Sequence, residues 1–171
     1  IEYGAYTLPH YDNITDEEKM DALHNAAYDA QLWNTLAQPG GWRREVGPRG
    51  RLLSGGERQR VCLARALYRE ELMRSVQDMD TIVLMDEITS SLDVRTESDI
   101  IQSLIEKRVK KQRVTLLMIA HRLASVQFCD KIIVMKEGRI VESGNHAQLL
   151  ALNGWYAEAW RLQSAGRSNQ S

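Results

Sequence analysis

Residues that could bind phosphate or activate water occur at four places in the chain. The first is Leu52-Leu-Ser-Gly-Gly-Glu-Arg-Gln-Arg60, where a Ser-Gly-Gly turn precedes the apolar periodicity of a helix. The first N–H groups of a helix and its dipole attract anions. Gly55 and Gly56 let a phosphate approach the backbone closely, and Ser54 adds a hydroxyl donor. An ordinary serine cap beside a glycine turn explains the same pattern, so both interpretations stay open for this segment alone.

The second place is the pair of acids that ends Ile82-Val-Leu-Met-Asp-Glu87. A continuous apolar run with β-branched residues is typical of a buried parallel strand. Ligands of α/β proteins bind at the carboxyl ends of such strands. Asp86 can hold Mg²⁺ there, directly or through water, and Glu87 can orient or deprotonate a water aimed at a γ-phosphate. The alternative is a solvated strand end without chemistry.

The other two places are His121 and Thr89-Ser-Ser-Leu-Asp93. His121 follows the apolar run 114–120, so it also lies at the carboxyl end of a predicted strand and can face the same crevice as Asp86. A structural histidine is the competing interpretation. The segment 89–93 comes directly after the acids, and it also fits the N-cap of a helix.

Changes in apolar periodicity predict the elements that must position these residues. Helices are predicted over about 16–28, where Thr15 and Glu18 form a capping box, over 30–37, and from the segment Leu53-Ser-Gly-Gly56 to about residue 77. A loop rich in Gly and Arg covers 38–53. The remaining elements are strands over 81–85, 114–120, 131–135 and 139–142 and helices over 94–110, 145–152 and 154–163, with a hairpin turn at Glu137-Gly138. This order predicts a helical subdomain over 1–80, the C-terminal part of a parallel-sheet α/β core over 81–163, and a polar tail over 164–171.

Composition narrows the class of protein. The 22 Lys and Arg residues nearly balance 23 Asp and Glu residues, so the net charge is −1 and a nucleic-acid partner is not expected. Cys62 and Cys129 lack the spacing of a metal site. No apolar run approaches the roughly 20 residues of a membrane span. The chain starts at Ile1 without a methionine, so we expect a fragment whose targeting and membrane segments lie upstream.

Taken together, the four places resemble the ATP-binding-cassette (ABC) ATPase family. LSGGERQR, IVLMDE, SSLD and IAHRL occur in the family's order, and the resemblance covers nearly the whole chain. It implies a partial P-loop NTPase fold of the ABC type. The resemblance implies that Ser54, Gly55, Gly56 and Glu57 form the signature motif, which contacts the γ-phosphate of ATP held by a partner domain. It implies Mg²⁺ support through water for Asp86 and the role of catalytic base for Glu87. Ser91 and Asp93, within 90–93, match the D-loop at the dimer interface, and His121 matches the switch histidine.

The sequence departs from the family pattern in two respects. The phosphate-binding motif GxxxxGK[ST] is absent from the 171 residues, so we expect the chain alone to be inactive. The segment from Glu70 to Asp80 is longer than the family's usual passage between the signature helix and the next strand. We interpret it as one or two added helical turns without a known role.

Other segments are similar to exporters. IAHRL, GRIVESGNHAQLL and WYAEAW look like exporter-type domains, and SGGERQR with DEITSSLD looks most like mitochondrial half-transporters of the iron–sulfur-related class. This likeness implies ATP hydrolysis coupled to export of a solute. The implied partners are a second nucleotide-binding domain and a fused or associated transmembrane domain, and the implied location is a membrane, the matrix face of the mitochondrial inner membrane for that class. The alternatives are a soluble ABC ATPase of the chromosome or DNA-repair type and a non-catalytic regulatory ABC domain.

Overall fold

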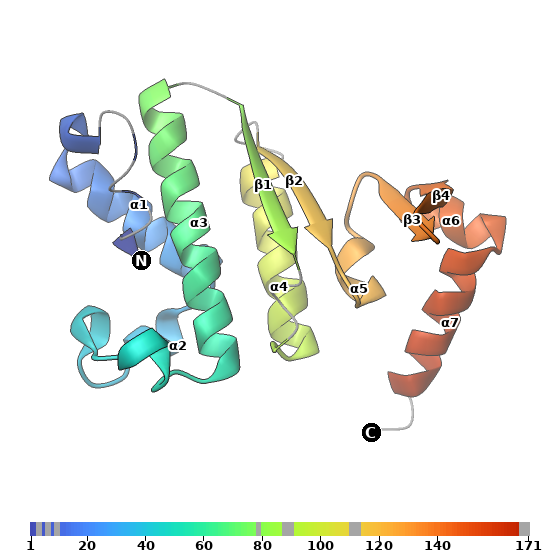
Figure 1. Cartoon of the computed structure of the whole chain (residues 1–171), viewed down its shortest axis with the longest axis horizontal. Helices are drawn as coiled ribbons and strands as arrows, with labels where there is room; N and C mark the ends of the chain where they lie inside the picture. The colour runs from blue at the N-terminus through green and yellow to red at the C-terminus, as the bar shows by residue number, and fades with distance from the viewer. Residues whose placement is uncertain are drawn as a thin grey trace. The chain divides into compact units, whose positions relative to one another are not determined.

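The computed structural model describes residues 1–2, 5, 8, 11–77, 80–86, 91–109 and 114–167. The chain divides into two compact units, residues 1–119 and 120–171, and each is described by itself. The first unit holds α1 (Asp16–Asp29), α2 (Trp33–Leu36), α3 (Gly55–Gln77), β1 (Thr81–Asp86), α4 (Val94–Leu104) and β2 (Val114–Ile119) (Figure 1). Short 3₁₀ turns cover Tyr11–Asn13, Gly41–Arg43 and Pro48–Gly50.

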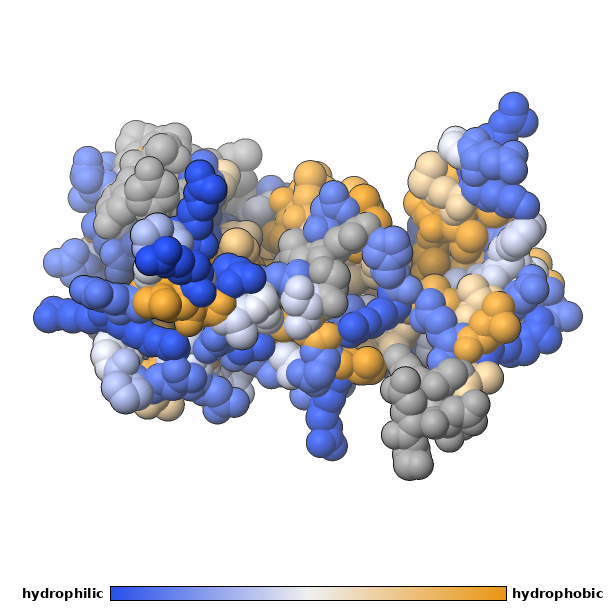
Figure 2. All heavy atoms as spheres, turned by 60° about the horizontal axis from the view of Figure 1, so that its bottom comes forward, coloured by the Kyte–Doolittle hydropathy of each residue, from blue (hydrophilic) through white to orange (hydrophobic). Residues whose placement is uncertain are grey.

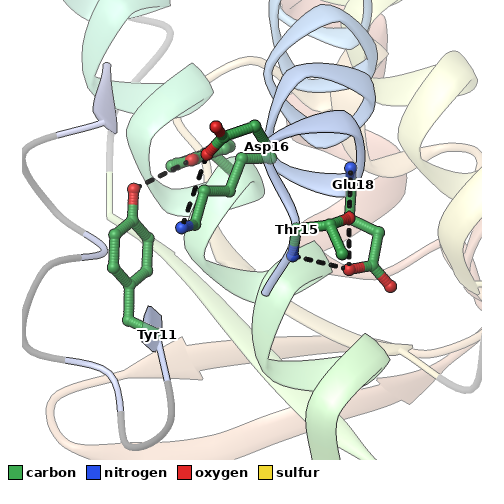
Figure 3. A network of polar contacts seen from close by, with 6 residues as sticks. Tyr11, Thr15, Asp16 and Glu18 are labelled. Atoms are coloured by element: carbon green, nitrogen blue, oxygen red, sulfur yellow. Dashed lines mark hydrogen bonds and ion pairs between the residues drawn. The ribbon is translucent and has the colours of Figure 1, made fainter. Parts of the chain in front are cut away.

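Helix α1 begins at the predicted capping box. The Glu18 N–H donates to Thr15 Oγ1 at 3.2 Å, and Glu18 Oε2 accepts from the Thr15 N–H at 2.9 Å (Figure 3). The three acids of the first turn also suit the positive end of the helix dipole. The predicted helix over 16–28 is therefore confirmed.

Helix α2 is shorter than predicted. Ala30 is the C-cap of α1, and Gln31 has a φ of 52°, in the left-handed region, so neither residue can start a second helix. The prediction of a helix over 30–37 was wrong at both ends, because a turn replaces its first residues.

One apolar cluster joins α1, α3, α4 and the inner face of the sheet. The described part of the added segment after Glu70 is helical, as predicted, because α3 continues to Gln77. Leu72 is buried in the cluster, and Asn25 Nδ2 donates to Glu71 Oε1 at 2.8 Å, which holds this part of α3 against α1. Figure 1 shows the two helices side by side.

Strands β1 and β2 pair in parallel, with Asp86 opposite Ile119 at their carboxyl ends. Val83 and Met85 are buried on one face. The other face is apolar but exposed; its large side chains are Ile82 (67% exposed), Leu84 (71%), Leu117 (58%) and Ile119 (60%). In Figure 2, orange patches mark apolar side chains that are exposed among hydrophilic ones on the face shown. Fully buried strands were predicted, and the structure corrects this, because no element of the described residues covers the second face.

The helix predicted over 94–110 is α4 continued by a π-helical segment, Ile105–Val109. Ile100, Ile101 and Leu104 bury its apolar side. Lys107 Nζ lies 3.2 Å from Asp29 Oδ1 and 4.0 Å from the centre of the Tyr28 ring, so this segment is attached to the end of α1.

The second unit contains the antiparallel hairpin of β3 (Ile132–Lys136) and β4 (Arg139–Gly144) with α5 (Leu123–Val126), α6 (His146–Leu152) and α7 (Trp155–Arg167). Glu137 and Gly138 both have positive φ, as the predicted hairpin turn requires. Of the residues of β3, only Ile132 is buried. Helix α7 continues four residues past its predicted end at 163, into the predicted polar tail.

Ile132, Leu149 and Tyr156 form the centre of this unit. Among the described residues of both units, every helix is too short or too polar to cross a membrane.

Candidate functional site

Ser54 begins helix α3 through two reciprocal hydrogen bonds. The Ser54 N–H donates to Glu57 Oε2 at 2.7 Å, and the Glu57 N–H donates to Ser54 Oγ at 3.1 Å. This is the capping box that a Ser-x-x-Glu sequence favours. The interpretation of this segment as a helix cap is therefore confirmed. It does not conflict with phosphate binding, because the hydroxyl that accepts from Glu57 can still donate its own proton.

Glu57 is fixed by more than the cap. Its Oε1 accepts from Thr35 Oγ1 at 3.2 Å and lies 3.7 Å from Arg44 Nη1. The hydrogen bond from the Ser54 N–H is the main cause that lowers the pKa of the Glu57 carboxyl, and Thr35 and Arg44 add to it. Glu57 therefore holds the turn before α3 against the loop of residues 38–53 as a carboxylate.

The turn at Ser54 contacts the loop predicted to lie at a dimer interface. The Ser91 N–H donates to Gln59 Oε1 at 2.9 Å. A Cβ added at Gly56 would lie 3.2 Å from Leu92 Cδ2 and 3.3 Å from the Ser91 carbonyl oxygen. The absence of a side chain at Gly56 thus lets the two segments approach.

The hydrogen-bond donors of the same turn are suited to binding a phosphate group. Gly55 and Gly56 lie in the first turn of α3, where N–H groups have no acceptor within the helix. With the Ser54 hydroxyl they form a set of hydrogen-bond donors at the positive end of a 23-residue helix.

Asp93 is the N-cap of α4. Its Oδ1 accepts from the Thr96 N–H at 2.9 Å. Hydrogen bonding with Thr96 lowers the pKa of the Asp93 carboxyl. The alternative interpretation of residues 89–93 as a helix cap is confirmed for this residue, and its role at a dimer interface stays a prediction.

Asp86 is the last residue of β1, at the exposed carboxyl end of the sheet. This is the position that the sequence predicted for a magnesium-supporting carboxylate. Glu87, the predicted catalytic base, lies outside the described residues, as does Ser90 of the predicted D-loop.

His121 belongs to the second unit, whereas Asp86 belongs to the first. It is exposed and comes two residues after the end of β2. Its carbonyl oxygen accepts a hydrogen bond from Gln163 Nε2 at 2.9 Å, so α7 contacts the backbone of the predicted switch histidine.

Sequence reasoning did not single out Gln59 or Gln163. Gln59 is part of the quoted LSGGERQR motif, but no local pattern indicates that its amide binds Ser91, 32 residues away. Gln163 was the last residue of a predicted helix, and its partners lie 40 and 42 residues before it. Both contacts come from tertiary packing, which the helical and strand periodicities do not encode.

Comparison with known proteins identifies relatives of one kind. The chain is 44% identical over 154 residues to ABC transporter B family member 6 of Dictyostelium discoideum, covering 90% of the chain and 21% of that protein. It is 38% identical over 151 residues to the mitochondrial iron-sulfur clusters transporter atm1 of Aspergillus fumigatus, covering 88% and 19%. The structure is also similar to a solved bacterial Atm1-family ABC exporter with ATP bound, with a TM-score of 0.73 and 36% sequence identity. The match covers 95% of the present chain and 25% of the exporter chain.

The chain is homologous to ABC transporters over about 90% of its length. Its resemblance to exporter-type ABC proteins, including mitochondrial ones, is confirmed, and so is its partial ABC fold. The ABC relatives also include an ATP-dependent lipid A-core flippase of Paraburkholderia xenovorans, 42% identical over 154 residues that cover 90% of the chain and 23% of the flippase. The chain thus spans about a fifth to a quarter of the length of these ABC proteins. It matches no protein-family profile.

Proposed function

We propose that this chain is the C-terminal part of a nucleotide-binding domain that hydrolyses ATP, with Mg²⁺, to drive export of a solute. The observation that carries the proposal is the hydrogen bond from the Ser91 N–H to Gln59 Oε1 of α3, together with the close approach of Gly56 to the Ser91 carbonyl oxygen. This proximity of segments 54–59 and 91–92 supports their interpretation as signature motif and D-loop, on a chain whose relatives are ABC transporters.

In the proposed dimer, two domains face each other head to tail. The Ser54 hydroxyl and the first N–H groups of α3 bind the γ-phosphate of ATP held by the partner domain. Asp86 and Glu87 serve the nucleotide of their own domain. Glu87 accepts the proton of a water that attacks the γ-phosphorus as the bond to ADP breaks, and His121 donates a hydrogen bond to the γ-phosphate.

Asp86 would hold Mg²⁺ through water, and the bound ion would supply charge neutralisation at the phosphates. A carboxylate at the end of a parallel strand is suited to this role, since it is a hard oxygen ligand at the edge of the sheet where ligands of α/β proteins bind.

The remainder of the site lies outside these 171 residues in this proposal. A phosphate loop upstream of the chain holds the ATP of its own domain, and a fused or associated transmembrane domain selects the solute. The exposed apolar face of β1 and β2 supports a larger domain, because parallel sheets are covered on both faces. By likeness to the mitochondrial relatives, the proposed location is the mitochondrial inner membrane, with the nucleotide-binding domain on the matrix side.

The relatives favour an exporter over the two alternatives. The names of the relatives described above are those of transporters and a flippase. The presence of Glu87 and His121 at the predicted motif positions favours a catalytic over a purely regulatory domain in the complete protein.

The substitution Glu87→Gln in the complete transporter tests the proposal. We expect ATP binding to remain, because the phosphate-binding groups are unchanged, while turnover falls by about 100-fold or more through loss of the base. The matched control is Glu137→Gln, at the exposed turn between β3 and β4, which leaves turnover unchanged. Turnover at the wild-type rate in Glu87→Gln removes Glu87 from the role of base.

A further inference from the structure

Helix α5 has only four residues and directly follows the predicted switch histidine. Its N-cap residue, Arg122, is extended and makes no side-chain capping hydrogen bond. Helices this short are not stable alone, and their first N–H groups need acceptors from elsewhere. The contacts that hold α5 in place therefore also determine the backbone conformation directly after His121.

The side chain of Gln163 supplies that contact from α7. Its Oε1 accepts from the Leu123 N–H at 2.9 Å, and its Nε2 donates to the His121 carbonyl oxygen at 2.9 Å. One planar amide thus joins the groups on both sides of Arg122. The opposite orientation of the amide would set donor against donor and acceptor against acceptor, so only one orientation satisfies both contacts.

Helix α7 is itself anchored at its start. The Glu142 carboxylate accepts from the N–H groups of Trp155 and Tyr156, which caps α7 from β4. Tyr156 is buried, and its hydroxyl lies 2.8 Å from His146 Nδ1. Gln163 lies seven residues after Tyr156, two turns along the same face of the helix. Its amide is therefore presented by a rigid element.

We propose that Gln163 is a positioning residue that fixes the backbone of His121. This inference rests on the proposed function of His121 as the histidine that contacts the γ-phosphate. Because the amide binds main-chain groups on both sides of Arg122, it orients the His121 backbone directly.

The test compares Gln163→Ala and Gln163→Glu in the complete transporter. The control is Ser164→Ala, an exposed position on the same helix. We expect Gln163→Ala to lower kcat about tenfold with KM for ATP unchanged, since two hydrogen bonds of ordinary strength are lost. Gln163→Glu keeps an acceptor for Leu123 but loses the donor to His121, so its kcat is also reduced. Ser164→Ala has the wild-type kcat.

Hydrogen exchange in the same proteins separates positioning from stability. In Gln163→Ala we expect amides of residues 121–126 to exchange about tenfold faster, while those of 155–162 keep their protection. Unchanged exchange at 121–126 overturns the proposal, and so does equally accelerated exchange in α7, which would indicate a stabilising role only. Wild-type kcat in Gln163→Ala also overturns it. If instead His121→Ala has wild-type turnover, the proposed role of His121 fails, and exchange alone decides whether Gln163 fixes this backbone.

Discussion

Single residues at the start of α3 combine an observed structural role with a proposed functional one. Ser54 and Glu57 satisfy each other's backbone N–H groups, and Glu57 also contacts Thr35 and Arg44. The family role of the signature motif needs a Ser-Gly-Gly turn in a fixed geometry. The cap supplies that geometry before any nucleotide is present, which is a form of preorganisation.

The contribution of Glu57 to stability depends on pH in a definite direction. Because the pKa of its carboxyl is lowered in the folded state, the contribution is present above the ordinary pKa of about 4.3 and is lost as the pH falls through the lowered value. We expect Glu57→Ala to lower the free energy of unfolding by about 1 kcal/mol at pH 7, the usual cost of losing a cap.

Urea denaturation at pH 7 and near pH 3 measures this effect. The difference between wild type and Glu57→Ala should shrink at the lower pH. The control Glu45→Ala, at an exposed position in the neighbouring loop, should show little effect at either pH. A difference for Glu57→Ala that grows on acidification would contradict the assignment of Glu57 as a charged cap.

At the scale of elements, Glu142 on β4 caps α7, and Gly154 makes room for it. A Cβ at Gly154 would lie 2.1 Å from Glu142 Oε1, closer than any real contact. We expect Gly154→Ala to destabilise the second unit by about 1–3 kcal/mol, because the carboxylate must leave the helix terminus. Thermal denaturation of Gly154→Ala, Glu142→Ala and the double variant measures the coupling between the two positions.

The cost of Gly154→Ala should be smaller when Glu142→Ala has already removed the carboxylate. Gly138→Ala is the comparison, because nothing lies within 4 Å of its added Cβ, and its cost should be the same with or without Glu142. Full additivity of Gly154→Ala and Glu142→Ala would show that the carboxylate does not occupy this space.

Local sequence signals predicted the elements well and their tertiary contacts poorly. The box at Thr15 and Glu18 and the turn at Glu137 and Gly138 were predictable, because their partners lie within three residues. The turn at Gln31 was not, since its positive φ falls on a residue type that gives no signal for the left-handed region. The link from Gln163 to His121 spans 42 residues and has no periodic signal.

The motif positions could be predicted from residue type and order, but their geometry could not. Ser54, Ser91 and Asp86 lie at a helix start, in a loop against that helix, and at a strand end, as the motifs imply. No local pattern indicated that Gln59 of α3 accepts a hydrogen bond from the Ser91 N–H. The apolar run 82–85 also predicted that both faces of β1 are buried. Such a run indicates that a strand needs to be covered, but it does not show which segment covers it.

At the scale of the whole molecule, the chain carries parts of two half-sites. Ser54 to Gly56 are proposed to act on ATP held by a partner, and Asp86, Glu87 and His121 on ATP held by a phosphate loop that the 171 residues do not contain. The relatives are four to five times longer than the matched region, which leaves room for that loop and for membrane spans.

The most direct test of the account is phosphate release by the purified 171-residue chain in the presence of Mg²⁺ and ATP. The account predicts no turnover above the buffer rate, because no lysine of a phosphate loop neutralises the β- and γ-phosphates. Mg²⁺-dependent phosphate release by the pure chain, abolished by Glu87→Gln, would contradict it.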